Sequence, residues 1–203
     1  MNQRPRMTGP SGAMSAILLA CVVSACPACR STLDRPLEST EAGASSLAQG
    51  HALLAGLFAD ESRLADILVL KSPRGGIAEV VRRISSRAKA DLKSMRSMAT
   101  LPPAIEGTED GLPLIEVDAR DRIADQQAAT LLLSGGRRFE RALLLTQEKA
   151  TGYAAALAAS LAQADPNESR RQAFAEMSEA WTGLGDDVRA WLEVVEKDPA
   201  SGD

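Results

Sequence analysis

Apolar residues recur every three or four positions along most of this chain, a spacing that places them on one face of an α-helix. The clearest case predicts a helix from about 168 to 197, whose apolar stripe comprises Phe174, Met177, Trp181, Leu184, Val188, Trp191 and Val195. The run Asp165-Pro166-Asn167-Glu168 predicts its start, because an N-cap acid followed by proline and a further acid favours helix initiation. We interpret the stripe as a core seam of a helical bundle.

The same spacing predicts three further helices. The first runs from about 46 to 70, with Leu47, His51, Leu54, Phe58, Glu61, Ala65 and Leu68 on one face. The second runs from about 77 to 99, with Ile77, Val81, Ile84, Ala88, Leu92 and Met95 on one face. The third is long, from about 115 to 163, with Ile123, Gln127, Leu131, Phe139, Leu143, Thr146, Ala150, Tyr153, Leu157 and Leu161 as its inner positions.

Proline and glycine separate these segments. A Pro/Gly turn lies at 71–76, and the region 100–114 has three prolines and two glycines, which indicates a crossover loop. Gly135-Gly136 interrupts the third helix, and two glycines cost about 2 kcal/mol relative to alanine. The pair indicates a kink, close helix packing or a division into two helices.

The predicted fold is therefore an all-α, antiparallel four-helix bundle over residues 46–199, with a long third helix that bends at Gly135 in one interpretation. The composition agrees, because aromatic residues are only 3% of the chain and alanine and leucine supply most of its apolar content. Such a composition favours helices over the β-branched and aromatic residues of strands.

The N-terminal segment has the pattern of an export signal. Arg4 and Arg6 precede an uncharged apolar stretch from Ala13 to Val23. This stretch is too short to span a bilayer, which requires about 20 apolar residues, and it has the length of the apolar region of a signal peptide. We expect residues 1–25 to be a cleaved signal peptide.

The residues that follow resemble the lipobox of bacterial lipoproteins, in which an aliphatic and two small residues precede the acylated cysteine. Val23-Ser24-Ala25-Cys26 matches that pattern, and Leu18-Leu19-Ala20-Cys21 matches it more loosely. The resemblance implies that Cys26 becomes the lipidated N-terminus, with plain secretion as the alternative. Residues 26–45 would then form the lipidated end and a flexible tether, since the stretch after Arg30 has no helical periodicity.

Cys26-Pro27-Ala28-Cys29 has the spacing of a thioredoxin-like redox centre, but it lies at the end of a leader and not in a βαβ unit. Haem attachment would require histidine at position 30, which is Arg30. If Cys21 leaves with the leader and Cys26 is acylated, Cys29 has no partner, and we expect no disulfide in the helical domain.

The charge of the chain argues against a nucleic-acid partner. Its formal net charge is −4, and loss of Arg4 and Arg6 with the leader would make it −6. The sequence has no Lys/Arg-rich run to neutralise phosphates, and one Tyr and three Phe offer no platform for stacking bases.

The second half of the chain resembles exported proteins of unknown function with a ferritin-like fold. The resemblance rests on the segment Ser134-Gly135-Gly136-Arg137-Arg138-Phe139-Glu140, on Leu143-Leu144 and Gln147, and on the order of helix pairs around a proline-rich loop near 101–113. It covers about 150 residues and implies a ferritin-like four-helix bundle, in which a metal site would lie among the helices.

The chain departs from the ligand pattern of di-iron proteins, which use glutamates and two Glu-x-x-His motifs. His51 is the single histidine, and Ala48 stands three residues before it. The weak candidates for metal ligands are Glu61, Glu140 and His51. His51 and Glu61 share the apolar stripe of the first helix, but ten residues place them about 15 Å apart along its axis. We expect Glu61 to pair with Arg120 or Arg122 across the bundle.

Motifs for nucleophilic catalysis and for phosphate or dinucleotide binding are absent from the sequence. We therefore expect no cofactor and no catalytic residue. The expected function is that of a cell-envelope lipoprotein, anchored through Cys26 and facing the periplasm or the exterior, with a non-catalytic bundle that has a structural role or binds a partner or ligand. The alternatives are a carboxylate-based metal binder or metal-dependent oxidoreductase of ferritin-like type, and an adaptor that assembles through exposed Trp181 and Trp191.

Overall fold

A computed structural model of the chain describes residues 40–105 and 114–198, and within these residues the only regular elements are helices. Four helices are long, namely α1 (Thr40–Glu61), α3 (Gly75–Met98), α5 (Gly136–Ala164) and α6 (Glu168–Lys197). A fifth, α4 (Leu114–Leu133), comes between α3 and α5 in the chain. The short 3₁₀ helix η2 (Leu64–Asp66) and α2 (Ile67–Leu70) follow α1.

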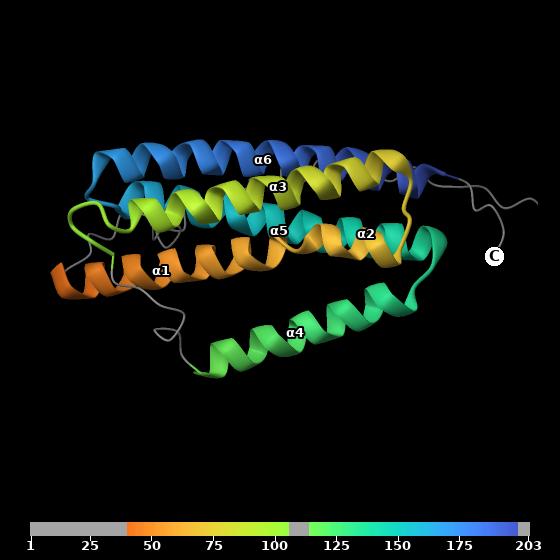
Figure 1. The fold of residues 1–203 in the computed structure, drawn as a ribbon, viewed down its shortest axis with the longest axis horizontal. Coiled ribbons are helices and arrows are strands. Elements are labelled where there is room, and N and C mark those ends of the chain that lie inside the picture. The colour runs from red at the N-terminus through yellow and green to blue at the C-terminus, as the bar shows by residue number, and fades with distance from the viewer. Residues whose placement is uncertain (1–39, 106–113, 199–203) are drawn as a thin grey trace, which may run out of the picture. The chain divides into compact units, whose positions relative to one another are not determined.

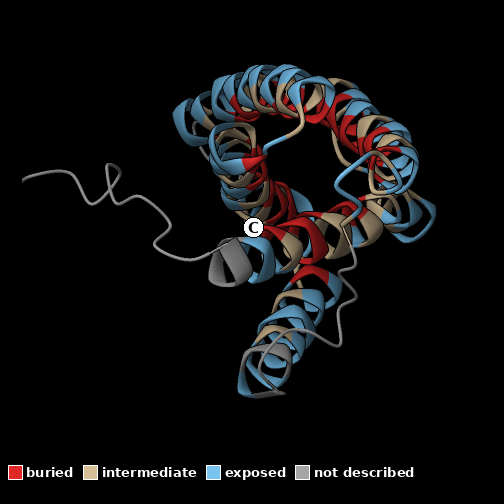
Figure 2. Ribbon diagram, turned by 90° about the vertical axis from the view of Figure 1, so that its left-hand side faces the viewer, coloured by how far each residue is buried: buried red, intermediate tan, exposed pale blue. Residues whose placement is uncertain are grey.

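The four long helices pack as a bundle. Contacts join α1 to α3, α1 to α5, α3 to α6 and α5 to α6, so each helix has two neighbours in a closed ring. In Figure 1, α1 and α6 run in one direction, and α3 and α5 run in the other. Figure 2 looks at the end where α1 begins and shows the buried positions lining the inside of the ring. The helical bundle expected from the periodicity is confirmed.

The core of the bundle is aliphatic and contains few aromatic rings. Its fully buried large side chains are Trp181, Arg170, Phe58, Phe174, Leu54, Ile77, Ile84, Met95, Leu143, Leu144, Val81 and Val188. The rings of Phe58 on α1 and Trp181 on α6 stack with their centroids 4.9 Å apart. Full burial of the apolar side chains among them contributes about 1.5–3 kcal/mol each, so these residues account for much of the packing energy.

The first helix begins earlier and ends earlier than predicted. Regular α-helix extends from Thr40, inside the segment expected to be a tether, to Glu61. The Ser62 hydroxyl then donates to the Ala59 carbonyl over 2.7 Å, and the Ser85 hydroxyl donates to the Ser62 carbonyl over 2.6 Å. These bonds satisfy carbonyl groups at the helix end, and the chain continues as η2 and α2 instead of one helix to residue 70.

The predicted long third helix is two helices. Gly135 has extended backbone before the first turn of α5, and Gly136 has φ of 51°. A positive φ is accessible to glycine without steric penalty, which explains why the glycine pair ends one helix and begins another. Helix α4 lies beside α5 and apart from the ring of the other four helices (Figures 1 and 2).

After Leu143, the buried positions of α5 are offset by about one residue from the predicted inner positions. The buried positions there are Gln147, Thr151, Ala154 and Ala158, instead of Thr146, Ala150, Tyr153 and Leu157. Tyr153 is 41% exposed, and its hydroxyl accepts a hydrogen bond from Nη2 of Arg120 on α4. Small residues on the inner face allow α5 and α6 to approach closely, and an alanine-rich segment offers little contrast from which to predict that face. Ile123, another predicted inner position, is 54% exposed on α4.

The stripe of α6 is confirmed, with a shift at its start. Asn167, and not Asp165, is the N-cap, because its side chain accepts a 3.0 Å hydrogen bond from the Arg170 backbone N–H. Trp181 is fully buried and Trp191 is partly buried against the core. The adaptor hypothesis required both tryptophans to be exposed, and it is therefore wrong.

Among the residues that the structure describes, no helix is both long and apolar enough to cross a bilayer.

Candidate functional site

The three predicted metal-ligand candidates occupy separate places in the bundle. His51 and Glu61 are buried on α1, and Glu140 is buried near the start of α5. In the part of the chain that the structure describes, no three His, Cys, Asp or Glu side chains come together as a metal-binding group. Each of the three residues has its own set of neighbours, described in turn below. Cys26, the predicted lipidation site, lies outside the described residues.

Glu140 forms a junction between three helices at the end of the bundle where α3 begins. Its Oε1 accepts a 2.8 Å hydrogen bond from the Arg74 backbone N–H, and its Oε2 accepts one of 2.9 Å from Arg74 Nε. The same guanidinium pairs through Nη1 with Asp198, just after α6, over 3.1 Å. Both oxygens of Glu140 are therefore engaged in fixing the turn before α3 to α5.

Glu61 is the last residue of α1, and its side chain faces Gln147 on α5. Burial raises the pKa of Glu61 to about 7, a hydrogen bond from Gln147 opposes the rise, and nearby Asp60 adds to it. Glu61 Oε2 and Gln147 Oε1 are both buried without a hydrogen-bond partner. These two oxygens make the Glu61–Gln147 pair the least satisfied polar contact of the core.

The expected partners of Glu61 have other contacts in the structure. Arg120 donates to the Tyr153 hydroxyl over 3.2 Å, and Arg122 pairs with Asp118 on its own helix over 2.8 Å. Asp60, the neighbour of Glu61, lies near α4. Burial raises the pKa of Asp60, the positive charge of Arg63 lowers it, and the negative charge of Asp121 raises it further. The end of α1 thus gathers two acids, and the helix dipole there disfavours their charge.

His51 lies near the middle of α1, edge-on to Phe174 with ring centroids 6.2 Å apart. Burial lowers the pKa of His51, and a hydrogen bond to the Met95 backbone partly opposes this. Its Nε2 is buried without a partner. A neutral imidazole enclosed by apolar groups is consistent with a core histidine, and nearby Arg170 disfavours its protonation further.

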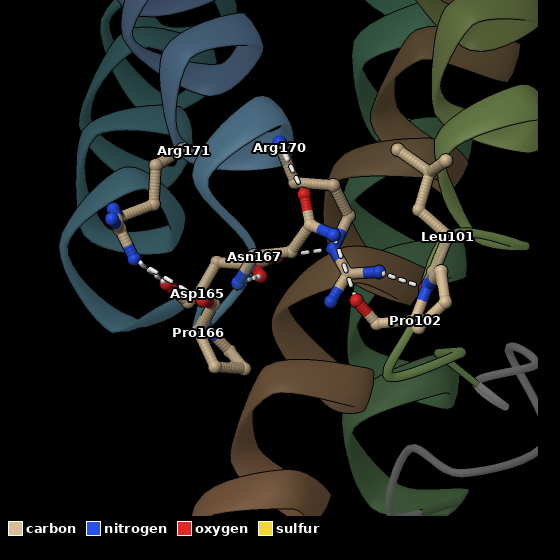
Figure 3. A network of polar contacts seen from close by, with 7 residues as sticks. All are labelled: Leu101, Pro102, Asp165, Pro166, Asn167, Arg170 and Arg171. Carbon is tan, nitrogen blue, oxygen red and sulfur yellow. Dashed lines mark hydrogen bonds and ion pairs between the residues drawn. The ribbon is translucent and has the colours of Figure 1, made fainter.

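Figure 3 shows the polar network that joins the start of α6 to the chain after α3. The side chains of Asp165 and Arg170 are 0% exposed and form an ion pair over 2.7 Å. Arg170 Nη1 donates to the Leu101 carbonyl over 2.5 Å, and Asn167 Nδ2 donates to the Pro102 carbonyl over 2.7 Å. This network ties the start of α6 to the backbone carbonyls of Leu101 and Pro102, while Nη2 of Arg170 is buried without a hydrogen-bond partner.

Another buried acid connects the core to the surface. Asp91 on α3 is 4% exposed, and its Oδ2 accepts hydrogen bonds from Trp181 Nε1 over 2.8 Å and from Arg87 Nε over 2.7 Å. Arg87 is partly exposed on the outer side of α3. Asp91 therefore links the indole at the centre of the core to a guanidinium at the surface.

That guanidinium lines a groove of about 440 Å³ between α3 and α6. Its walls are Arg83, Ser86, Arg87 and Ala90 from α3, and Ala180 and Leu184 from α6. Arg83 Nη2 pairs with Asp187 over 2.8 Å. Because a guanidinium carries five N–H donors, each arginine can donate to a ligand while it keeps its aspartate. Two arginines and a hydroxyl beside an apolar floor offer contacts that suit a small amphipathic anion bound at the surface.

Sequence reasoning missed the buried roles of Asp91 and Arg170, although a signal was present. Ile84, Ala88, Asp91 and Met95 follow one another at spacings of four, three and four, which places the acid on the apolar stripe. Arg170 likewise stands four residues before Phe174 on the stripe of α6. A charged residue in register with an apolar stripe indicates a buried ion pair or hydrogen bond.

Comparison of this chain with protein-family models, with curated proteins and with solved structures finds no match.

Proposed function

We propose that this chain is an exported lipoprotein of the cell envelope, acylated at Cys26, whose helical bundle binds a small ligand or a partner and does not catalyse a reaction. The proposal on export rests on the leader pattern of residues 1–25 and on Val23-Ser24-Ala25-Cys26. The observation that carries the binding role is the groove between α3 and α6, where Arg83, Ser86 and Arg87 stand beside an apolar floor.

We also propose ferritin-like connectivity for the bundle. In this arrangement the two central helices run in the same direction, so the connection between them must cross the length of the bundle. The directions of α3 and α5 in Figure 1, with α4 between them in the chain, support this proposal. We propose that Glu140 has a structural role in this bundle and is not a metal ligand, because both of its carboxylate oxygens accept hydrogen bonds from Arg74.

The second candidate function, carboxylate-based metal binding or metal-dependent oxidation, is favoured by one observation. Glu61 Oε2 and Gln147 Oε1 are buried oxygens without partners, and hard cations prefer oxygen ligands. Metal analysis of the purified full chain and its Glu61→Gln variant separates the two functions. Stoichiometric Fe, Mn or Zn that disappears in the variant would favour the metal function, whereas the same trace content in both proteins favours the binding function.

Metabolic labelling with a palmitate analogue tests the anchor. We expect the full chain to be labelled in a bacterial host and Cys26→Ser to lose the label. Cys21→Ser and Cys29→Ser are matched controls that should keep it. Loss of label in Cys21→Ser alone would assign the anchor to the rival site, and equal labelling of all variants would contradict acylation at Cys26.

Binding of the anionic dye anilinonaphthalene sulfonate tests the groove. Ala90 is exposed on the wall of the groove, so Ala90→Trp should fill it without disturbing the core. We expect this variant to bind the dye several-fold more weakly than the parent chain. Ala128→Trp, at an exposed position on α4, is the control and should bind it normally. Equal binding by the two variants would contradict a ligand site in the groove.

A further inference from the structure

Three cations stand close together on the outer face of α3. Lys89, Lys93 and Arg96 are all exposed and follow one another at spacings of four and three residues. Residues at these spacings are neighbours on a helix surface, and like charges placed so repel one another. The three residues are called the basic stripe below.

The basic stripe differs from the other cations of α3. Arg82 pairs with Glu79 over 3.6 Å, Arg83 pairs with Asp187, and Arg87 pairs with Asp91. For the members of the basic stripe, by contrast, no ion pair is found among residues 40–105 and 114–198. These three cations repel one another and have no ion pair in the described residues, so they do not stabilise α3. Their adjacency is notable in a chain whose net charge is −4.

Two of the helices near the basic stripe carry few charged residues. At the end of the bundle that holds the basic stripe, α1 has no acidic or basic residue between 44 and 59 apart from His51, and α5 has none between 150 and 164. At the start of α6, Asp165 pairs with Arg170 and Glu168 pairs with Arg171, and Glu176 and Glu179 are exposed further along that helix. In the described part of this end, the three cations of the basic stripe thus outnumber the further exposed acids of α6.

The basic stripe is also at the end of the bundle where the described chain begins. Helix α3 ends at Met98, close to the end at which α1 starts with Thr40 (Figures 1 and 2). Thirteen residues lie between Cys26 and Thr40, and such a segment spans at most about 50 Å. An anchor at Cys26 would hold this end of the bundle within that distance of the bilayer.

We propose that the basic stripe docks the bundle on a membrane surface that carries anionic phospholipid. The occupant follows from charge complementarity and from the direction in which the chain approaches α1, and the proposal rests on the proposed lipid anchor. Each Lys or Arg near an anionic surface strengthens binding about fivefold, and the effect fades beyond a Debye length. Three adjacent cations together would give roughly a hundredfold preference for the anionic surface, which favours this orientation of the bundle.

Lysine acetylation of the full chain, read by mass spectrometry, tests the docked face directly. Vesicles of phosphatidylcholine alone are compared with vesicles that also contain phosphatidylglycerol. We expect phosphatidylglycerol to slow acetylation of Lys89 and Lys93 several-fold while Lys149 and Lys197 react as before. The leader is present in both samples and cancels in the comparison. Equal rates with the two vesicle types, or equal slowing at all four lysines, would overturn the proposal.

Charge removal gives an independent test by vesicle co-sedimentation at low salt. The full-chain variant K89Q/K93Q/R96Q should lose roughly a hundredfold of its preference for phosphatidylglycerol vesicles. The control R63Q/R82Q/R122Q removes the same charge from exposed cations that already have partners, and should keep the preference. Equal loss in both variants would show a general charge effect and reject the docking surface, as would binding of the parent chain that does not depend on phosphatidylglycerol. If Cys26 proves unacylated while the basic stripe still binds, the anchor alone is rejected.

Discussion

The indole Nε1 of Trp181 donates a 2.8 Å hydrogen bond to Asp91, whose carboxylate is buried at the contact between α6 and α3. The aspartate accepts from Arg87 through the same oxygen, so a core aromatic residue and the wall of the surface groove share one acceptor. Removal of the carboxylate would leave a buried indole N–H without a partner.

Asp91→Ala should accordingly lower the free energy of unfolding by about 1–3 kcal/mol. The tryptophan emission should change as well, since the indole loses its acceptor. Chemical denaturation followed by fluorescence measures both effects. Asp118→Ala removes an exposed acid from α4 and should alter stability by less than about 0.5 kcal/mol. A buried role for Asp91 would be rejected if the two variants were equally stable.

The buried carboxyl group of Glu61 should make the free energy of unfolding depend on pH. Burial raises its pKa from 4.5 to about 7, so the folded chain retains a proton that the unfolded chain loses between these values. Stability should therefore fall as the pH rises from about 4.5 to 7. Glu61→Gln should remove this fall and be more stable than the parent chain at pH 8, by up to about 3 kcal/mol.

Urea denaturation at a series of pH values measures that difference. Glu79→Gln, at an exposed position on α3, is the control and should follow the parent chain. If Glu61→Gln were less stable than the parent chain at pH 8, the carboxylate would have a favourable partner when charged.

Gly76 fixes the approach of α3 to α6. A Cβ at this position would stand 1.9 Å from Cζ2 of Trp191, whereas a Cβ at Gly75 meets nothing within 4 Å. Gly76→Ala should destabilise the bundle by about 1–3 kcal/mol, and Gly75→Ala should be neutral or slightly stabilising. Thermal unfolding compares the two, and Trp191→Leu should rescue Gly76→Ala in part. A neutral Gly76→Ala would mean that the indole ring can move aside.

The buried ion pair of Asp165 and Arg170 should be sensitive to the loss of one partner. Asp165→Ala leaves a fully buried guanidinium without its carboxylate, for which we expect a loss of about 3–5 kcal/mol. Arg122→Ala, which breaks an exposed pair on α4, should change stability by less than about 1 kcal/mol. Denaturant midpoints would measure both, and similar small effects would contradict the tight packing of Arg170.

The fold was predictable where large apolar residues contrast with polar neighbours. The stripe of α6 has Phe174, Met177 and Trp181 on one side and charges elsewhere, and its burial followed the prediction. The inner face of α5 was less predictable, because Ala150, Ala154 and Ala158 offer similar side chains to every direction. The division at Gly135-Gly136 was one of three open interpretations, and its outcome depends on the backbone conformation of Gly136.

The candidate site was less predictable than the fold. His51, Glu61 and Glu140 were identified from their residue types, but only packing decides that Glu140 meets Arg74 and that Glu61 meets Gln147. The groove lies between helices whose facing residues are far apart in the sequence, with Arg87 on one wall and Ala180 on the other. Pairing of that kind depends on helix order and register, which periodicity within a single helix does not contain.

The central claim is that this chain is a lipoprotein whose mature N-terminus is Cys26. The most direct measurement is mass spectrometry of the N-terminal fragment of the protein extracted from membranes of a bacterial host. We expect a fragment that begins at Cys26 and carries a diacylglycerol group on the sulfur. A fragment that begins at another residue, or that begins at Cys26 without a lipid, would contradict it.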